Sequence, residues 1–184
     1  MPSESESRWD GALGTSIVDE SPEASADGLR SRPGRPPGRP VATAVTKTVE
    51  QSIIISRPVA DVFAYRSALE NGAAWQSGVL ACELAVPGSA GLGTRCTEIR
   101  RGPGGAIEAW ELEITEYEPD SVVGVIACCG LQRMTERHMF TSEGDNTRYT
   151  LSVEISGSPA LTASVQRKIV ENLVRFRERV EDRR

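Results

Sequence analysis

The sequence has few of the side chains that usually bind metals. It has one histidine, His138, and four cysteines, no two of which have the Cys-x-x-Cys spacing. A structural zinc site normally takes about four nitrogen or sulfur ligands at short, regular spacings. We therefore expect no metal and no cofactor, and the sequence supports no Ser-His-Asp arrangement.

An excess of positive charge is also missing. The chain has 21 lysines and arginines against 26 acidic residues, a formal net charge of −5. Proteins that bind nucleic acids usually carry a clear basic excess. We therefore expect no nucleic-acid partner.

Long apolar runs are absent as well. The longest run, Val122 to Cys129, is far shorter than the roughly 18 residues of a membrane-spanning helix. The N-terminus is acidic and does not resemble a signal peptide. These features predict no stable membrane insertion, a cytoplasmic location and reduced thiols. Adjacent strand residues point to opposite faces, which favours packing roles for Cys128 and Cys129, with a reactive thiol as the alternative.

Residues 1–43 differ in composition from the rest of the chain. Their first part is acidic, and their second part carries four arginines and four prolines. We expect a disordered acidic tail with a Pro/Arg-rich linker over 1–43, followed by one domain over 44–184. The alternative is a lid, because Trp9, Leu13 and Ile17 have the spacing of one helical face.

The rest of the chain mixes strands with three helices. A β-rich run ends near Pro58, which can occupy the first turn of a short helix, and a second short helix is expected over 69–74. Short turn-like breaks between the later strands favour antiparallel pairing. The later strands are expected at 78–86, 93–101, 106–117, 121–128, 131–141 and 147–156.

The last element has the clearest pattern. Ser158 is a good N-cap, and Pro159 suits the first helical position. Apolar residues then recur every three or four positions, which predicts an amphipathic helix of about 22 residues that packs across the sheet. The stripe consists of Leu161, Val165, Ile169, Leu173, Phe176 and Val180.

Five short motifs, in order and at suitable spacing, resemble the START-like, birch-pollen-allergen-like superfamily (SRPBCC), which includes the polyketide cyclase/dehydrase proteins. The motifs are Ile53 to Phe63, which contains Pro58, then Trp75 to Val79, Gly91 to Arg95, Ile114 to Pro119, and Asn146 to Arg148. The resemblance covers about residues 46–182. It implies an α+β helix-grip fold, in which a curved antiparallel sheet wraps around a long C-terminal helix and two short helices follow the first strand. It also implies a cavity between sheet and helix, but no universal catalytic motif.

Strand 131–141 carries the candidate catalytic residues. Met134, Glu136, His138 and Phe140 alternate onto one face, and their apolar character predicts that this face points inward. An inward Glu136 and His138 could act as an acid–base pair. A shift of register by one residue would instead turn Arg133 and its neighbours inward, and the cavity would then suit an anionic ligand.

The predicted ligand-binding residues come from the strands and from the last helix. The resemblance suggests that Cys96 points inward, whereas the other residues follow from alternation or from the helical stripe. The full set is Cys96, Glu108, Trp110, Leu112, Met134, Phe140, Leu161, Val165, Ile169 and Leu173. The glycine-rich segment 88–93 joins two strands, so it is interpreted as a hairpin or gate and not as a phosphate loop.

Three functions remain open at this point. The first is binding or transfer of a mostly apolar ligand, such as a lipid or isoprenoid. The second is a cyclase or dehydratase of the aromatase type that acts on a polyketide-like molecule. The third is a maturation factor that docks to a partner protein. All three are compatible with a homodimer, and the lining of the cavity should separate the first from the second.

Overall fold

The computed structural model describes residues 14–18, 46–156 and 159–183. The strands are β1 (Gly14–Val18), β2 (Thr46–Ile55), β3 (Val79–Leu84), β4 (Arg95–Arg101), β5 (Ile107–Glu118), β6 (Val122–Cys129), β7 (Gln132–Glu143) and β8 (Asn146–Ser156). The helices are α1 (Val59–Ser67), α2 (Gly72–Trp75) and α3 (Pro159–Glu181), with short 3-10 turns η1 (Leu69–Asn71) and η2 (Pro103–Gly105).

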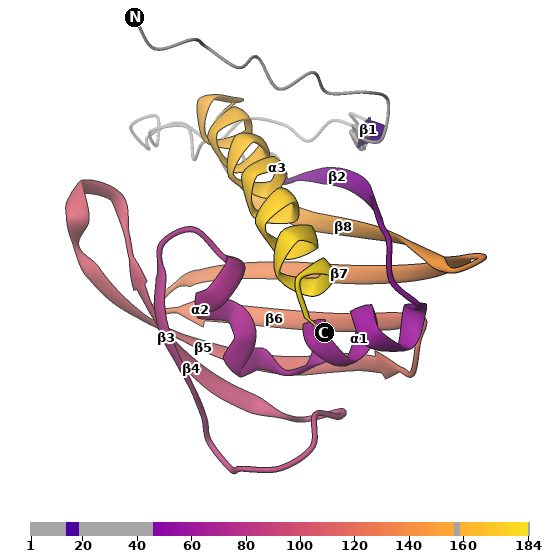
Figure 1. Ribbon diagram of the computed structural model, residues 1–184. Helices are drawn as coiled ribbons and strands as arrows, with labels where there is room; N and C mark the ends of the chain where they lie inside the picture. Colours follow the sequence, from indigo (N-terminus) through magenta and orange to yellow (C-terminus); the bar gives the residue numbers. More distant parts are fainter. Residues whose placement is uncertain (1–13, 19–45, 157–158, 184) are drawn as a thin grey trace, which may run out of the picture.

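All eight strands form one antiparallel sheet in the order β1-β2-β8-β7-β6-β5-β4-β3. From β3 to β8 each strand pairs with the next one along the chain, and β2 pairs with β8. Irregularities in register at Val79/Ala81 and Ile114/Glu116 mark places where the sheet can bend. The helices lie together on one face of the sheet, and α3 crosses it (Figure 1). The predicted α+β helix-grip fold is confirmed.

The first helices begin where the sequence indicated. Pro58 precedes α1, and its carbonyl accepts hydrogen bonds from the amides of Asp61 and Val62. The second predicted helix is divided into η1 and α2, and α2 extends to Trp75. Ser158, the predicted N-cap of the last helix, lies outside the described residues.

The apolar stripe of α3 forms the centre of the core. Leu173 and Phe176 are fully buried, and Ile169 and Val180 are nearly so. Phe176 stacks on Tyr149 at 4.7 Å between ring centroids and contacts Trp75 edge to face at 5.1 Å. These rings join α3 to β8 and α2, so burial of the stripe fixes the helix against the sheet.

The segment 14–18 differs from the prediction for the tail. The sequence analysis placed it in a disordered region or, alternatively, on a helical lid, whereas the structure pairs it with β2 from Gly14–Ser52 to Val18–Thr48. Thr15, Ile17 and Val18 are β-branched, and the edge of β2 that faces away from β8 offers backbone groups with which this segment can pair. The remainder of residues 1–43 lies outside the described residues, and so does the lid's Trp9.

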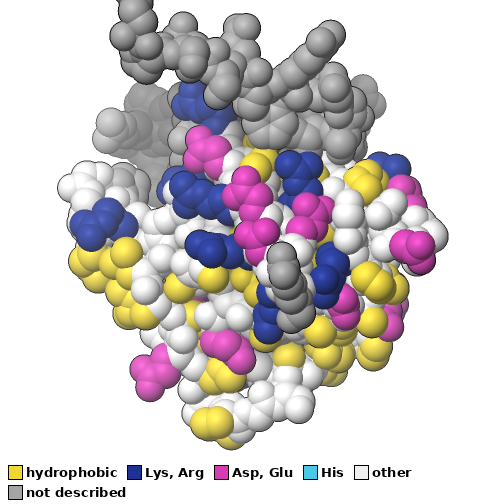
Figure 2. Space-filling model, in the orientation of Figure 1, with side chains coloured by type: hydrophobic (Ala, Val, Ile, Leu, Met, Phe, Trp, Pro, Cys, Tyr) yellow, Lys and Arg dark blue, Asp and Glu magenta, His cyan; other side chains and the backbone are white. Residues whose placement is uncertain are grey.

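The outward face of α3 is strongly charged. Figure 2 shows positive and negative side chains intermixed along it. The exposed charged residues of α3 include Arg167, Lys168, Glu171, Arg175, Glu178 and Arg179. Within the described ranges, no helix is both long and apolar enough to cross a bilayer.

Candidate functional site

A cavity of about 320 Å³ lies between α3 and the inner face of the sheet. This volume is at the lower end of the range for small-molecule sites, which is roughly 300–1,000 Å³. The turn after α2, the β4–β5 connection and α3 contribute to its lining together with the strands. Its apolar wall consists of Trp75, Val79, Trp110, Met134, Leu151, Val153, Val165 and Ile169.

Half of the predicted ligand-binding residues line this cavity. They are Glu108, Trp110, Met134, Val165 and Ile169. Glu108 also accepts a hydrogen bond from the indole Nε1 of Trp110 at 3.0 Å, which orients that ring.

Four other predicted residues lie in the packed core and not in the cavity lining. These are Cys96, Leu112, Phe140 and Leu173, all of which are buried. The cavity occupies only part of the space under α3, and side chains of the early helices fill the rest. Phe63 of α1, for example, packs edge to face on Phe140 at 5.3 Å. The side chain of Leu161, the remaining member, is not among those described.

Strand β7 has the orientation that its apolar alternation indicated. Glu136 lines the cavity with a side chain that is 12% exposed, and His138 is fully buried behind it. Arg137 lies on the opposite face, where its guanidinium contacts both carboxylate oxygens of Glu116 at 2.9 Å. Arg133 is exposed. The alternative register, with Arg133 and Arg137 of β7 turned into the cavity, is therefore not the one observed.

Glu136 and His138 belong to a buried polar network. The Nε2 atom of His138 lies 3.2 Å from Glu136 Oε2 and also contacts the guanidinium of Arg66. Its Nδ1 atom and the Tyr149 hydroxyl are hydrogen-bonded at 2.7 Å. The Arg66 guanidinium lies 3.6 Å from the Glu136 carboxylate. A side chain from α1 thus holds two groups of β7 in place.

The sequence analysis missed Arg66 and Tyr149. A signal for Arg66 existed, because it follows Val62 by four positions and Phe63 by three, and both of these residues are buried. The helical spacing would have placed a charged side chain on the inward face of α1. Such a charge needs a partner, and Glu136 provides it.

The network fixes the charges of its members. Burial lowers the pKa of His138 to about 4, the positive charge of Arg66 acts in the same direction, and Glu136 opposes them. Burial alone would raise the pKa of Glu136, but its contacts with His138 and the charge of Arg66 hold it at about 2. At neutral pH the site therefore holds a neutral imidazole and an ionised carboxylate. Only the carboxylate reaches the cavity.

A second charged pair lies beside the tryptophan wall. Arg100 lines the cavity, lies 2.6 Å from Glu98 Oε2, and places its guanidinium 5.0 Å from the centre of the Trp110 ring. Glu98 is nearly fully buried, and this burial raises its pKa in spite of Arg100. The arginine thus gives the cavity a cationic group on the wall that carries Trp110.

A curved antiparallel sheet closed by a C-terminal helix, with a largely apolar cavity between them, defines the class of helix-grip proteins. A family model described as polyketide cyclase / dehydrase and lipid transport matches residues 46–181. The chain belongs to this family. The superfamily suggested by the five sequence motifs is thereby confirmed.

Solved structures with the same fold are distant in sequence. The aromatase/cyclase Zhui from Streptomyces sp. R1128 has a TM-score of 0.62 at 14% identity, over 74% of this chain and 94% of that one. Ara h 8.0201 has a TM-score of 0.60 at 14% identity, over 75% and 99%. CalU16 from Micromonospora echinospora has a TM-score of 0.54 at 14% identity, over 93% and 92%. A comparison with curated proteins finds no match.

Proposed function

We propose that the protein binds a mostly apolar, hydroxylated aromatic molecule in this cavity, as a polyketide cyclase/dehydrase-like biosynthetic protein of the cytoplasm. One observation carries the proposal: an ionised carboxylate, Glu136, lies in the same cavity lining as two tryptophans and several aliphatic side chains. The family description and the fold shared with an aromatase/cyclase support the same class of ligand.

The carboxylate determines which apolar ligands fit. A ligand that displaces water without replacing its hydrogen bonds leaves Glu136 poorly solvated. A ligand with a hydroxyl group at that point donates a hydrogen bond to the charge instead. Hydrogen bonds to charged groups contribute roughly 1.5–3 kcal/mol. Trp75 and Trp110 provide flat apolar surfaces that suit a ring system.

The roles predicted for Glu136 and His138 become distinct in this proposal. Glu136 contacts the ligand, whereas His138 lies behind it and acts, with Arg66, as a positioning residue. At neutral pH Glu136 is an ionised carboxylate and His138 is an uncharged imidazole, since their pKa values are about 2 and about 4. The pair therefore supports an acceptor of hydrogen bonds better than a donor of protons.

An enzymatic version is the second candidate. Ligand binding excludes water from the Glu136 carboxylate, which makes it a stronger base. It could then accept a proton from an enolisable carbon next to a ligand carbonyl, as a cyclase or dehydratase requires. A non-catalytic carrier or a partner-docking maturation factor, by contrast, would not need the carboxylate of Glu136 for its function.

The proposal can be tested with two ligands that differ by one hydroxyl group, 2-naphthol and naphthalene. The chain has three tryptophans, two of which line the cavity, so the indole N–H signals of 15N-labelled protein report binding directly. We expect 2-naphthol to bind roughly tenfold more tightly than naphthalene, and Glu136→Ala to remove this preference. Glu154→Ala, which alters an exposed glutamate on β8, is the matched control.

Two results would contradict the proposal. Equal binding of the two compounds to the unaltered protein would indicate a carrier of purely apolar ligands. Shifts that spare the signals of Trp75 and Trp110 would show that these compounds bind elsewhere.

A further inference from the structure

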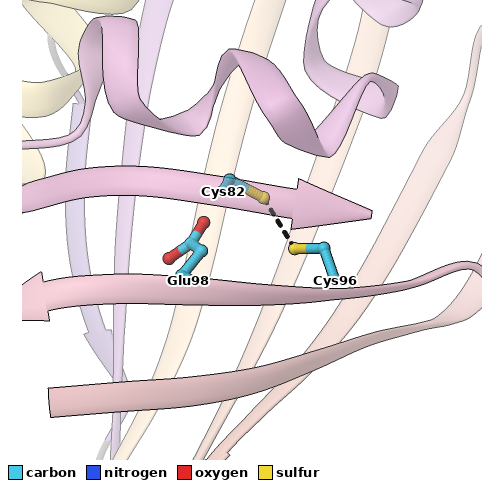
Figure 3. Close-up of side chains that lie close together, drawn as sticks. All are labelled: Cys82, Cys96 and Glu98. Atoms are coloured by element: carbon cyan, nitrogen blue, oxygen red, sulfur yellow. Dashed lines mark hydrogen bonds between the residues drawn. The ribbon is translucent and has the colours of Figure 1, made fainter. Parts of the chain in front are cut away.

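A cluster of three potential metal ligands lies outside the cavity lining. Cys82 on β3 is paired in register with Glu98 on β4, and Cys96 lies two residues before Glu98 on the same strand. All three side chains extend toward one another between the two strands (Figure 3). The sequence analysis expected no metal site because it looked for ligands at short spacings, whereas strand pairing brings these residues together across the hairpin.

The donor atoms are close and shielded from solvent. The two Sγ atoms are 2.8 Å apart, and the three donor atoms lie within 4.8 Å of one another. Cys96 and Glu98 are almost completely buried, while Cys82 is half-buried at the edge strand β3. Zinc binds sulfur at about 2.3 Å and carboxylate oxygen at about 2.0–2.2 Å. Two sulfurs around one tetrahedral zinc ion lie farther apart than the two Sγ atoms do here, so the side chains of Cys82 and Cys96 would rotate apart to admit the ion.

We propose that Cys82, Cys96 and Glu98 form a zinc-binding site that is separate from the cavity. Two sulfurs with one oxygen suit zinc better than magnesium, which prefers oxygen ligands alone, or copper(I), which prefers sulfur. Three protein ligands leave the fourth tetrahedral position to water.

Arg100 makes the charge balance of this site favourable. Two thiolates and a carboxylate carry three negative charges, which one zinc ion and the Arg100 guanidinium neutralise together. Both contacts of Arg100 with Glu98 go to the same oxygen, Oε2, at 2.6 and 2.7 Å. The second oxygen, Oε1, is thus the one to face the ion. A neutral cluster can be buried at a far smaller cost in solvation than an isolated charge.

The site would also connect the metal to the cavity. Arg100 lines the cavity and lies over the Trp110 ring. A zinc ion on Glu98 would therefore hold the guanidinium and the ring in a fixed position. The zinc site does not depend on the proposed ligand, since its three ligands come from the paired strands β3 and β4.

The experiment uses the full-length protein, reduced, treated with a chelator and then titrated with Zn²⁺ against a chromophoric chelator. We expect one zinc ion per chain, loss of at least 100-fold in affinity for Cys82→Ser and Cys96→Ser, and a smaller loss for Glu98→Gln. Cys128→Ser and Cys129→Ser remove the other two thiols and are the matched controls. Substitution with Co²⁺ in the unaltered protein should give intense thiolate-to-metal charge-transfer bands, a measurement that needs no variant.

Several outcomes would overturn the zinc site. They are the absence of zinc binding by the reduced protein, equal affinity in all four cysteine variants, and a Co²⁺ spectrum without thiolate bands. The zinc site would likewise be refuted if the reduced protein does not bind zinc but readily forms a disulfide between Cys82 and Cys96.

Discussion

The buried histidine should make the protein sensitive to mild acid. His138 is fully buried, and its pKa is lowered to about 4 from an ordinary value of about 6.5. In the unfolded chain the imidazole takes up a proton as the pH falls through about 6.5, whereas the folded protein resists protonation until about pH 4. Between these values the unfolded state binds more protons, so stability falls as the pH falls.

The size of this effect follows from the two pKa values. A gap of about two and a half pH units, at about 1.4 kcal/mol per unit, corresponds to roughly 3 kcal/mol of stability. This contribution is fully present above pH 6.5 and is lost by about pH 4. Glu136 continues the trend at lower pH, because its folded pKa of about 2 lies below its ordinary value of 4.5. Its contribution is lost as the pH falls from 4.5 toward 2.

Two measurements check this prediction. The chain has a single histidine, so one imidazole NMR signal can be followed without assignment and should not titrate between pH 7 and pH 5 in the folded protein. Urea unfolding at a series of pH values should show stability falling from pH 6.5 to pH 4. His138→Gln should flatten that slope, and it should also weaken the Glu136 contribution below pH 4.5, because contacts with His138 help to lower the pKa of Glu136.

The reasoning would be refuted by an imidazole signal that titrates near pH 6.5 in the folded state. It would also be refuted by a His138→Gln variant whose stability depends on pH as steeply as that of the unaltered protein. If the variant does not fold, the NMR titration of the unaltered protein still decides the question.

Two further predictions concern the ends of the domain. Leu173→Ala should lower the free energy of unfolding by about 2–5 kcal/mol, because the side chain is fully buried in the stripe of α3; a loss below about 0.5 kcal/mol in urea unfolding would contradict that burial. Deletion of residues 1–43 should change the melting temperature by only a few degrees, since the described part of this segment is five residues of edge strand, and deletion of 1–13 is the control that keeps β1. Collapse of the folded state on deletion of 1–43 would show that β1 is essential.

Most of the fold could be predicted from the sequence, because several elements each have their own local sequence pattern. The α3 stripe, Pro58 before α1 and the glycine- or proline-rich breaks between strands each predict one element independently. The strand β1 was not predicted, because the conformation of a short segment with two glycines nearby depends on its pairing with the edge of β2 and not on its own sequence pattern.

Only part of the candidate site could be predicted from the sequence. Alternation along β7 was sufficient to place Met134 and Glu136 toward the cavity, but it could not show that Phe63 fills the space next to Phe140. The contacts of Arg66 with Glu136 and of Cys82 with Cys96 depend on which elements meet in three dimensions. Such contacts join separate elements, and no spacing along a single element encodes them.

The residues that line the cavity differ in how freely they can change during evolution. Trp75, Leu151 and Val153 belong to the central core, where a substitution would disturb the packing of Phe176 and its neighbours. Met134 and Val165 are half-buried at the margin of that core and form another part of the lining. Relatives could acquire new ligand preferences by substitution at the margin while the core residues, and Glu136 anchored by Arg66, stay the same. The architecture thus separates the residues that preserve the fold from those that are free to diversify.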